Sequence, residues 1–192
     1  MSRFRISEFK KMHLWSIARI LDNLFQDKPF IGAEVGVFKG QTSKVLLEKF
    51  PECRLILVDP WRAWPEGHPY AEKGSMDPKT QVQWNEIYQE ALEAIGPAQR
   101  RCQVLRTTSD LAAQQIEDKS LDFVFLDADH TYEGTKADIQ SWLPKTRRVL
   151  LGHDYGGKND RLGFWGVKRA VDEAFGDKVV IRRGLIWAHF ID

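Results

Sequence analysis

The stretch Phe30–Ser43, FIGAEVGVFKGQTS, combines a short apolar run, a turn with two glycines and the first residues of a helical stretch. We expect a strand over Phe30–Val37 and a helix over Thr42–Phe50, with Gly36 and Gly40 in the turn between them. In open α/β sheets ligands bind outside the carboxyl ends of the strands. This turn is therefore predicted to border a ligand.

The same alternation of apolar runs and helical stretches continues along the chain, and it is typical of parallel sheets covered by helices on both faces. The predicted strands that follow are Arg54–Val58, Gln103–Arg106, Leu121–Leu126 and Arg148–Leu151. The predicted helices are Thr80–Ile95, Asp110–Glu117, Tyr132–Leu143 and Phe164–Phe175. The fold class is therefore predicted to be α/β, doubly wound and Rossmann-like.

The two ends of the chain complete this arrangement. Apolar residues recur at helical spacing over Ile6–Gln26, so an amphipathic helix is expected within residues 1–28. Near the other end, Val179–Arg182 and Leu185–Ile191 flank Arg183-Gly184, which indicates a hairpin. We expect seven mostly parallel strands with one antiparallel member near an edge. No repeat or linker divides the chain, so residues 1–192 are predicted to form one domain.

Composition excludes several function classes. The chain has 28 basic and 27 acidic residues and a formal net charge of +1, which gives no overall field to hold a nucleic acid. No apolar stretch is long enough for a membrane helix. Cys53 and Cys102 form no C-x-x-C pair, which fits a cytoplasmic protein. A small-molecule substrate is the partner we expect, and the exposed face of the first helix could pair with a second copy of the chain.

Acidic and hydroxyl side chains near the ends of the first three predicted strands bear on which ligand is bound. Glu34 stands two residues before Gly36, and Asp59 ends the second predicted strand 19 residues after Gly40, close to the spacing at which an acid reaches a ribose. Ser109 follows the third strand and, with Asp110, is an ordinary helix N-cap pair. Asp59 could equally cap the turn that follows it. The spacing G-x-G-x-x-G of nicotinamide-dependent oxidoreductases is absent, which disfavours that alternative.

The glycine turn resembles the first motif of S-adenosylmethionine-dependent methyltransferases. A stronger resemblance comes from LDFVFLDADHTYE (residues 121–133), LLGHDY (150–155) and GVKRAVDE (166–173). These segments resemble the family that includes macrocin-type and novobiocin-type sugar O-methyltransferases and cephalosporin hydroxylase proteins, over about Ile31 to Phe175. The resemblance implies methyl transfer from S-adenosylmethionine to a small-molecule acceptor, most naturally an oxygen. It implies cofactor contacts from Glu34, Gly36, Gly40, Asp59, Ser109 and Asp127.

A divalent cation is expected beside this cofactor. Asp127 and Asp154 end strands that should be neighbours, about 4.8 Å apart, so their carboxylates can converge on Mg²⁺ or another divalent ion. In the sugar methyltransferases a third acidic ligand precedes the position of Asp154, and here that residue is His153. Imidazole binds Mn²⁺, Fe²⁺ or Zn²⁺ more readily than Mg²⁺, so both the metal and the need for it stay open.

Two neighbouring residues compete for the role of catalytic base. Asp129 matches the family position proposed to remove the acceptor proton, and His130 is a chemically reasonable substitute. The alternatives are that Asp129 caps the following helix and that His130 is a solvated loop residue. The rival to an enzyme is a non-catalytic S-adenosylmethionine-binding module that senses the cofactor or supports a partner protein, and His153 keeps this alternative open.

A long irregular segment, residues 60–79, carries Trp61, Trp64 and Tyr70. Loops of this length in compact domains are usually functional or disordered. The aromatic residues suit either a lid over the acceptor or packing against the body of the protein, and a lid is the interpretation we favour.

Overall fold

The computed structural model describes residues 12–68 and 80–192. Its strands are β1 (Phe30–Val35), β2 (Cys53–Val58), β3 (Cys102–Leu105), β4 (Leu121–Leu126), β5 (Thr146–Gly152), β6 (Val179–Arg182) and β7 (Ile186–Phe190). Its α-helices are α1 (Met12–Phe25), α2 (Gln41–Lys49), α4 (Gln81–Ile95), α5 (Ser109–Ala113), α6 (Tyr132–Trp142), α7 (Lys158–Arg161) and α8 (Val167–Phe175), with 3₁₀ turns η2 (Gly96–Arg101) and η3 (Gly176–Lys178).

The described strands form one seven-stranded sheet in the order β3-β2-β1-β4-β5-β7-β6. β1 pairs in parallel with both β2 and β4, and β4 pairs in parallel with β5. β7 runs antiparallel to both β5 and β6, so it is the single reversed strand, one position in from the edge. The prediction of a mostly parallel, doubly wound sheet with one antiparallel member is confirmed.

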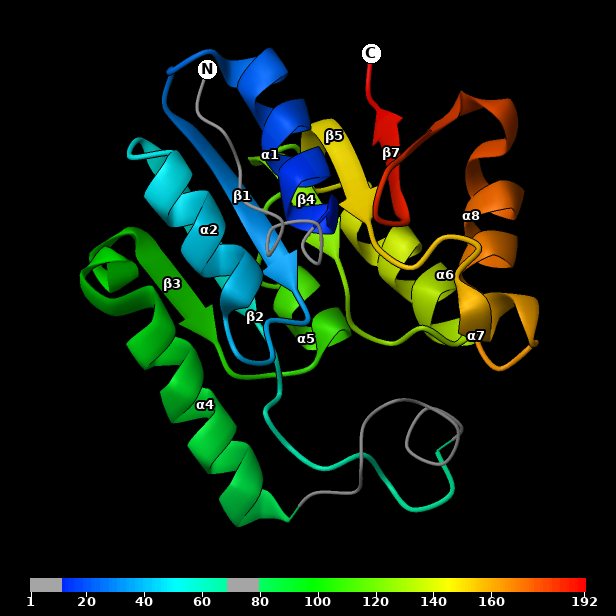
Figure 1. The fold of residues 1–192 in the computed structure, drawn as a ribbon, viewed down its shortest axis with the longest axis horizontal. Coiled ribbons are helices and arrows are strands. Elements are labelled where there is room, and N and C mark those ends of the chain that lie inside the picture. The colour runs from blue at the N-terminus through cyan, green and yellow to red at the C-terminus, as the bar shows by residue number, and fades with distance from the viewer. Residues whose placement is uncertain (1–11, 69–79) are drawn as a thin grey trace.

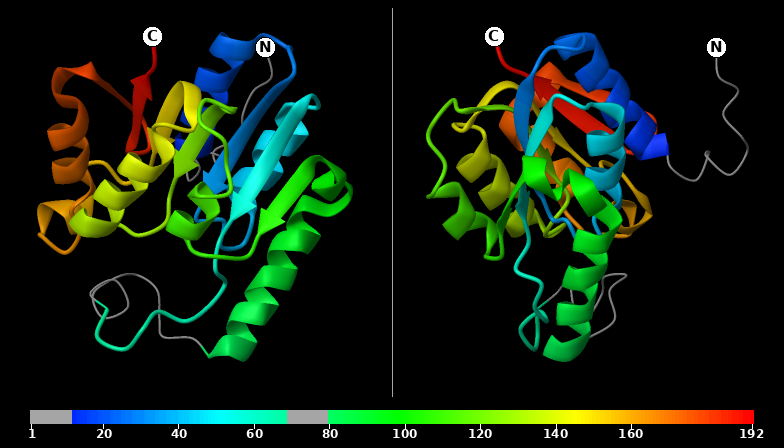
Figure 2. Two further views of the ribbon diagram at one scale, coloured as in Figure 1. Left: turned by 180° about the vertical axis from the view of Figure 1, so that it is seen from behind. Right: turned by 90° about the vertical axis from the view of Figure 1, so that its left-hand side faces the viewer.

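Helices cover both faces of this sheet (Figures 1 and 2). On one face, side chains of α1, α2 and α4 pack in one apolar core with alternate residues of the strands, including Leu55, Phe123 and Leu151. On the other face, α5, α6 and α8 enclose a second core. The central strands β1, β2 and β4 are buried on both faces, as expected of continuous apolar runs in a parallel sheet.

Local signals explain where several helices begin. Thr80 and Gln83 form a reciprocal capping box at α4, and the Thr131 hydroxyl accepts from Gly134 N–H at α6. The predicted helix Phe164–Phe175 begins only at Val167, because the Asp160 carboxylate accepts the Lys168 N–H from outside the helix. The short helix α7, Lys158–Arg161, was not among the predicted helices.

Two further boundaries differ from the sequence prediction. The helix expected over Asp110–Glu117 ends at Ala113, since the Gln115 and Ile116 N–H groups bond to carbonyls three residues earlier and tighten the chain into turns. The hairpin has three connecting residues, because Arg182 pairs with Ile186. Gly184 and Leu185 there have φ of 75° and 60°.

Within the residues that the structure describes, no helix is long and apolar enough to cross a membrane. Two predicted segments lie partly outside the described residues. They are residues 6–11 of the predicted N-terminal helix and residues 69–79 of the predicted lid, which include Tyr70.

Candidate functional site

A cavity of about 610 Å³ opens at the carboxyl ends of β1, β2 and β4. This is where open α/β sheets place ligands, and its volume is that of a small-molecule site. Six of the residues predicted to bind ligand or act on it line this cavity: Glu34, Gly36, Asp59, Ser109, Asp127 and Asp129. Sequence reasoning therefore located the cavity and much of its wall.

Gly36 lets the ends of β1 and β4 meet at the floor of the cavity. Its φ is +93°, and a Cβ there would lie 2.2 Å from the carbonyl oxygen of Asp127. Any other residue would clash with the backbone that carries Asp127. Gly40, by contrast, is not among the described lining residues; it is the N-cap of α2 and packs against Ala91 of α4.

Asp59 both lines the cavity and fixes two loops. One carboxylate oxygen accepts from the Phe38 N–H at 2.9 Å, and the other accepts from the Trp61 N–H at 2.7 Å. Burial raises the pKa of Asp59, although these backbone hydrogen bonds oppose the shift. The carboxylate keeps unused lone pairs on both oxygens, so capping the turn and binding a ligand are compatible.

Glu34 is a buried acid beneath the glycine turn, 2% exposed. Its carboxyl group accepts a hydrogen bond from the Ser43 hydroxyl of α2, which fastens the end of β1 to that helix. Burial raises the pKa of Glu34 to about 8, and the nearby Asp127 and Asp59 charges add to the shift while the Ser43 hydrogen bond opposes it. The group is therefore poised to ionise when a cation approaches.

A third buried acid, Asp138 of α6, lines the cavity on the side of Ser109. The Ser109 hydroxyl donates to Asp138 and accepts from Trp142 Nε1 at 2.8 Å. Burial raises the pKa of Asp138 to about 7. Sequence reasoning missed this residue. The available signal was its place with Thr135, Ile139 and Trp142 on the buried stripe of the helix, where an acid is out of place.

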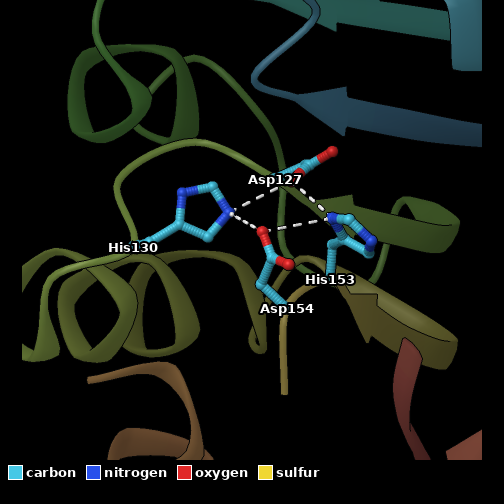
Figure 3. A group of neighbouring side chains, drawn as sticks. All are labelled: Asp127, His130, His153 and Asp154. Carbon is cyan, nitrogen blue, oxygen red and sulfur yellow. Dashed lines mark hydrogen bonds and ion pairs between the residues drawn. The ribbon is translucent and has the colours of Figure 1, made fainter. Parts of the chain in front are cut away.

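Asp127, His130, His153 and Asp154 form a compact cluster beside the cavity (Figure 3). His130 Nε2 lies 3.2 Å from Asp127 Oδ1 and 3.1 Å from Asp154 Oδ2, while His153 Nδ1 lies 3.4 Å from each of these oxygens. One ligand atom from each residue falls within 4.8 Å of all the others. The structure thus brings together the three predicted metal ligands and adds His130.

The cluster is electrostatically coupled. Burial disfavours the charged imidazoles, but hydrogen bonds and charges from the two aspartates outweigh it and raise the pKa of His130 to about 9 and of His153 to about 10. Burial likewise opposes charge on Asp127 and Asp154, yet the histidines lower the pKa of both. Two imidazolium ions and two carboxylates therefore give the cluster a net charge of zero. A divalent cation bound by two carboxylates and two neutral imidazoles would give the same net charge.

Asp129 lies on the cavity side of the cluster. Its Oδ1 accepts from the Thr131 N–H at 2.9 Å, and its Oδ2 lies 3.4 Å from His68 Nε2. His68 stacks on Trp64, with ring centroids 4.4 Å apart, and both line the cavity. Trp61 is instead 1% exposed and donates from Nε1 to the Phe38 carbonyl. The aromatic residues thus divide: Trp61 packs against the body, and Trp64 faces the ligand space.

α1 contributes a residue that sequence reasoning did not single out. His13 lines the cavity, and its ring lies 4.9 Å from that of His153. The backbone of α1 at this point packs against Gly184 of the hairpin turn, where a Cβ would lie 2.3 Å from His13 N. The N-terminal helix is therefore part of the cavity wall.

Comparison with known proteins places this geometry in context. A family model described as a methyltransferase domain, Methyltransf_24, matches residues 33–155. Among curated proteins, the uncharacterized protein y4gI of Sinorhizobium fredii is 35% identical over 82 residues. That alignment covers 42% of this chain and only 9% of the much longer relative.

Several solved structures share the fold. The O-methyltransferase TomG of Streptomyces achromogenes, in complex with SAM, superposes with a TM-score of 0.60 and 13% identity over 99% of this chain and 82% of its own. The N-methyltransferase NodS of Bradyrhizobium japonicum superposes with a TM-score of 0.60 and 11% identity, over 97% of this chain and 98% of its own. A TDP-rhamnose 3′-O-methyltransferase of calicheamicin biosynthesis superposes with a TM-score of 0.54 and 14% identity, over 98% of this chain and 88% of its own. At these identities the likeness is one of fold.

Proposed function

Because this chain belongs to the methyltransferase-domain family, we propose that it transfers the methyl group of S-adenosylmethionine to a hydroxyl oxygen of a small molecule, assisted by a divalent cation. In this reaction the methyl carbon leaves the sulfonium sulfur as its bond to the acceptor oxygen forms, and the hydroxyl proton passes to the protein. Such a transfer depends chiefly on holding the two reactants about 3 Å apart.

The observation that carries the proposal is the cavity at the carboxyl edge of the sheet. It brings the glycine turn after β1, the acid after β2 and Ser109 at the start of α5 into one space with Asp127 and Asp129. A cofactor pocket and an acceptor pocket must adjoin for direct transfer, and one continuous cavity is compatible with that requirement.

Five residues are assigned to the cofactor. Asp59 binds the ribose hydroxyls, since its carboxylate is held in place by two backbone N–H groups. Gly36 and Glu34 accommodate the methionine portion, whose ammonium group suits a buried acid. Ser109 lies at the adenine end, where Asp138 can accept from the exocyclic amino group.

Asp127, His153 and Asp154 are the residues that would hold the cation. Their oxygen and nitrogen atoms converge beside the cavity, and Asp127 lines it directly. When bound there, the cation would hold an acceptor hydroxyl and lower its pKa.

We assign proton removal to Asp129 rather than His130. Asp129 lines the cavity and has His68 beside it, so a proton that reaches its carboxylate can pass on to an imidazole. His130 directs Nε2 at Asp127 and Asp154, and it is only 7% exposed. The acceptor would lie between these groups, against Trp64 and His13.

The free thiols of Cys53 and Cys102 favour a cytoplasmic setting.

Calorimetric titration with S-adenosylmethionine, S-adenosylhomocysteine and NAD⁺ tests the proposal. We expect the first two to bind and NAD⁺ not to bind. Asp59→Asn should weaken their binding about 10- to 100-fold, because it removes a charged acceptor. Asp122→Asn is the matched control, since Asp122 also accepts from a backbone N–H, that of Ile31 at 2.9 Å, but does not line the cavity.

Binding of NAD⁺ but not of the other two ligands would indicate an oxidoreductase instead of a methyltransferase. Equal losses in both variants would show that Asp59 acts only through the fold. Formation of S-adenosylhomocysteine from S-adenosylmethionine in the presence of individual hydroxylated sugars and catechols would then identify the acceptor class.

A further inference from the structure

The donor set beside the cavity differs from one built for Mg²⁺. Mg²⁺ prefers oxygen ligands and keeps much of its water, whereas two of the four groups here are imidazoles. Sites that mix imidazole and carboxylate ligands suit the first-row transition ions. The two imidazoles therefore favour a first-row transition ion over Mg²⁺ at this site.

The donor atoms are close enough to share one ion, since all of them lie within 4.8 Å of one another. Four donors bound tetrahedrally at about 2.0–2.2 Å lie roughly 3.3–3.6 Å from one another. The four imidazole–carboxylate separations are 3.1, 3.2, 3.4 and 3.4 Å. The two imidazoles lie on either side of the Asp154 carboxylate, each with one nitrogen directed at the same pair of oxygens (Figure 3).

The surroundings hold His130 in this arrangement. Trp165 stacks on its ring, with centroids 4.4 Å apart. Gly166 N–H donates to the His130 carbonyl at 2.9 Å, so the segment before α8 fixes both ring and backbone. The His153 ring is similarly flanked by His13. Both imidazoles are thus restrained by packing before any ion binds, as the residues of a pre-formed site must be.

Charge and access are also suited to a divalent ion. Two carboxylates neutralise a charge of +2 when both imidazoles are neutral. His130 is nearly enclosed, with its side chain 8% exposed, whereas Asp127 is 25% exposed and lines the cavity. An ion at the centre would therefore be closed on the protein side and reachable from the acceptor side.

We propose that Asp127, His130, His153 and Asp154 together form a binding site for a first-row transition ion, with His130 as the fourth ligand, and that this site selects such an ion over Mg²⁺. The inference deepens the cation role in the proposed function, and it assigns His130 to binding rather than to catalysis. The rival explanation is a self-sufficient cluster of two imidazolium–carboxylate pairs.

Metal titrations separate these explanations. The chelator-treated full chain is titrated with Zn²⁺, Co²⁺ and Mg²⁺, and the Co²⁺ complex is followed by its visible ligand-field absorption. We expect one Zn²⁺ or Co²⁺ per chain, bound at least about 100-fold more tightly than Mg²⁺. His130→Ala should weaken Zn²⁺ binding about 10- to 100-fold and change the Co²⁺ spectrum.

His189→Ala is the matched control. His189 also stacks on an aromatic ring, that of Phe175 at 4.1 Å, but lies on β7 with its Nδ1 near the Lys178 carbonyl. This variant should bind Zn²⁺ as the wild type does. If His130→Ala fails to fold, pulsed electron paramagnetic resonance of the Mn²⁺-loaded wild type gives an independent count, and we expect couplings to two imidazole nitrogens.

Mg²⁺ binding as tight as Zn²⁺, an unchanged affinity in His130→Ala, or coupling to a single imidazole would overturn the proposal. No metal binding at all would establish the ion-paired cluster instead. S-adenosylhomocysteine is titrated into the same samples. Its binding without metal binding rejects this inference and the cation's part in the proposed function, and leaves methyl transfer standing. Metal binding without cofactor binding rejects methyl transfer and leaves the metal site standing.

Discussion

Replacing Asp138 by asparagine should abolish a loss of stability that the wild-type protein shows as pH rises. In the folded chain burial raises the pKa of Asp138 from its ordinary 3.8 to about 7. Between these values the folded state holds one proton more than the unfolded state, so the free energy of unfolding falls as pH rises. The slope is about 1.4 kcal/mol per pH unit, and over roughly three units the loss reaches about 4 kcal/mol.

The asparagine side chain would keep the shape of the protonated acid, and it could still accept from the Ser109 hydroxyl. Urea unfolding followed by tryptophan fluorescence, at intervals from pH 4 to pH 8, gives the free energy of unfolding of each protein. The difference, variant minus wild type, should grow by about 4 kcal/mol from pH 4 to pH 7 and then level off.

The control is Asp172→Asn. Lys168 and the Tyr155 hydroxyl outweigh partial burial and lower the pKa of Asp172, so its contribution is already complete at pH 5. That variant should lose stability by a small amount that stays constant from pH 5 to pH 8. If the Asp138→Asn and wild-type curves ran parallel across pH 4–7, the assignment of a buried, protonated acid at the cavity wall would be refuted.

Two further predictions concern the glycine turn. At pH 7 the buried Glu34, whose pKa is about 8, should release a proton when the cofactor ammonium binds, so calorimetric heats for S-adenosylmethionine should vary with the ionisation enthalpy of the buffer. Glu34→Gln should abolish that variation, whereas equal heats in all buffers for the wild type would show that Glu34 does not ionise on binding. Gly36→Ala should cost more than about 2 kcal/mol of stability and remove cofactor binding, because its Cβ would lie 2.2 Å from the Asp127 carbonyl oxygen. Gly163→Ala, which has φ of +73° but open space around it, should cost only about 1 kcal/mol and leave binding intact, and comparable thermal unfolding shifts in the two variants would contradict the steric argument.

Much of the fold could be predicted because the signals are local. The apolar runs and helical stretches set the order of elements, and the reversed strand followed from the hairpin around Gly184. Boundaries failed where a side chain bonds across a loop. Asp160 accepts from the Lys168 N–H at the start of α8, and the residue pattern around Phe164 does not reveal that contact.

The candidate site divides in the same way. Residues at the carboxyl ends of strands, such as Glu34, Asp59 and Asp127, were found because parallel strands deliver their ends to one edge. His13 and His68 reach the cavity through tertiary packing of α1 and of the segment after β2, which a linear pattern does not encode. His130 was noticed as a base, but its contact with Asp154, 24 residues away, became visible only in three dimensions.

A crystal structure of the chain with S-adenosylhomocysteine would test the central claim most directly. The account predicts the ligand in the cavity at the carboxyl edge, with its ribose hydroxyls on Asp59, its sulfur near Gly36 and its adenine beside Ser109 and Asp138. A ligand bound elsewhere, or one whose ribose does not meet Asp59, would contradict it.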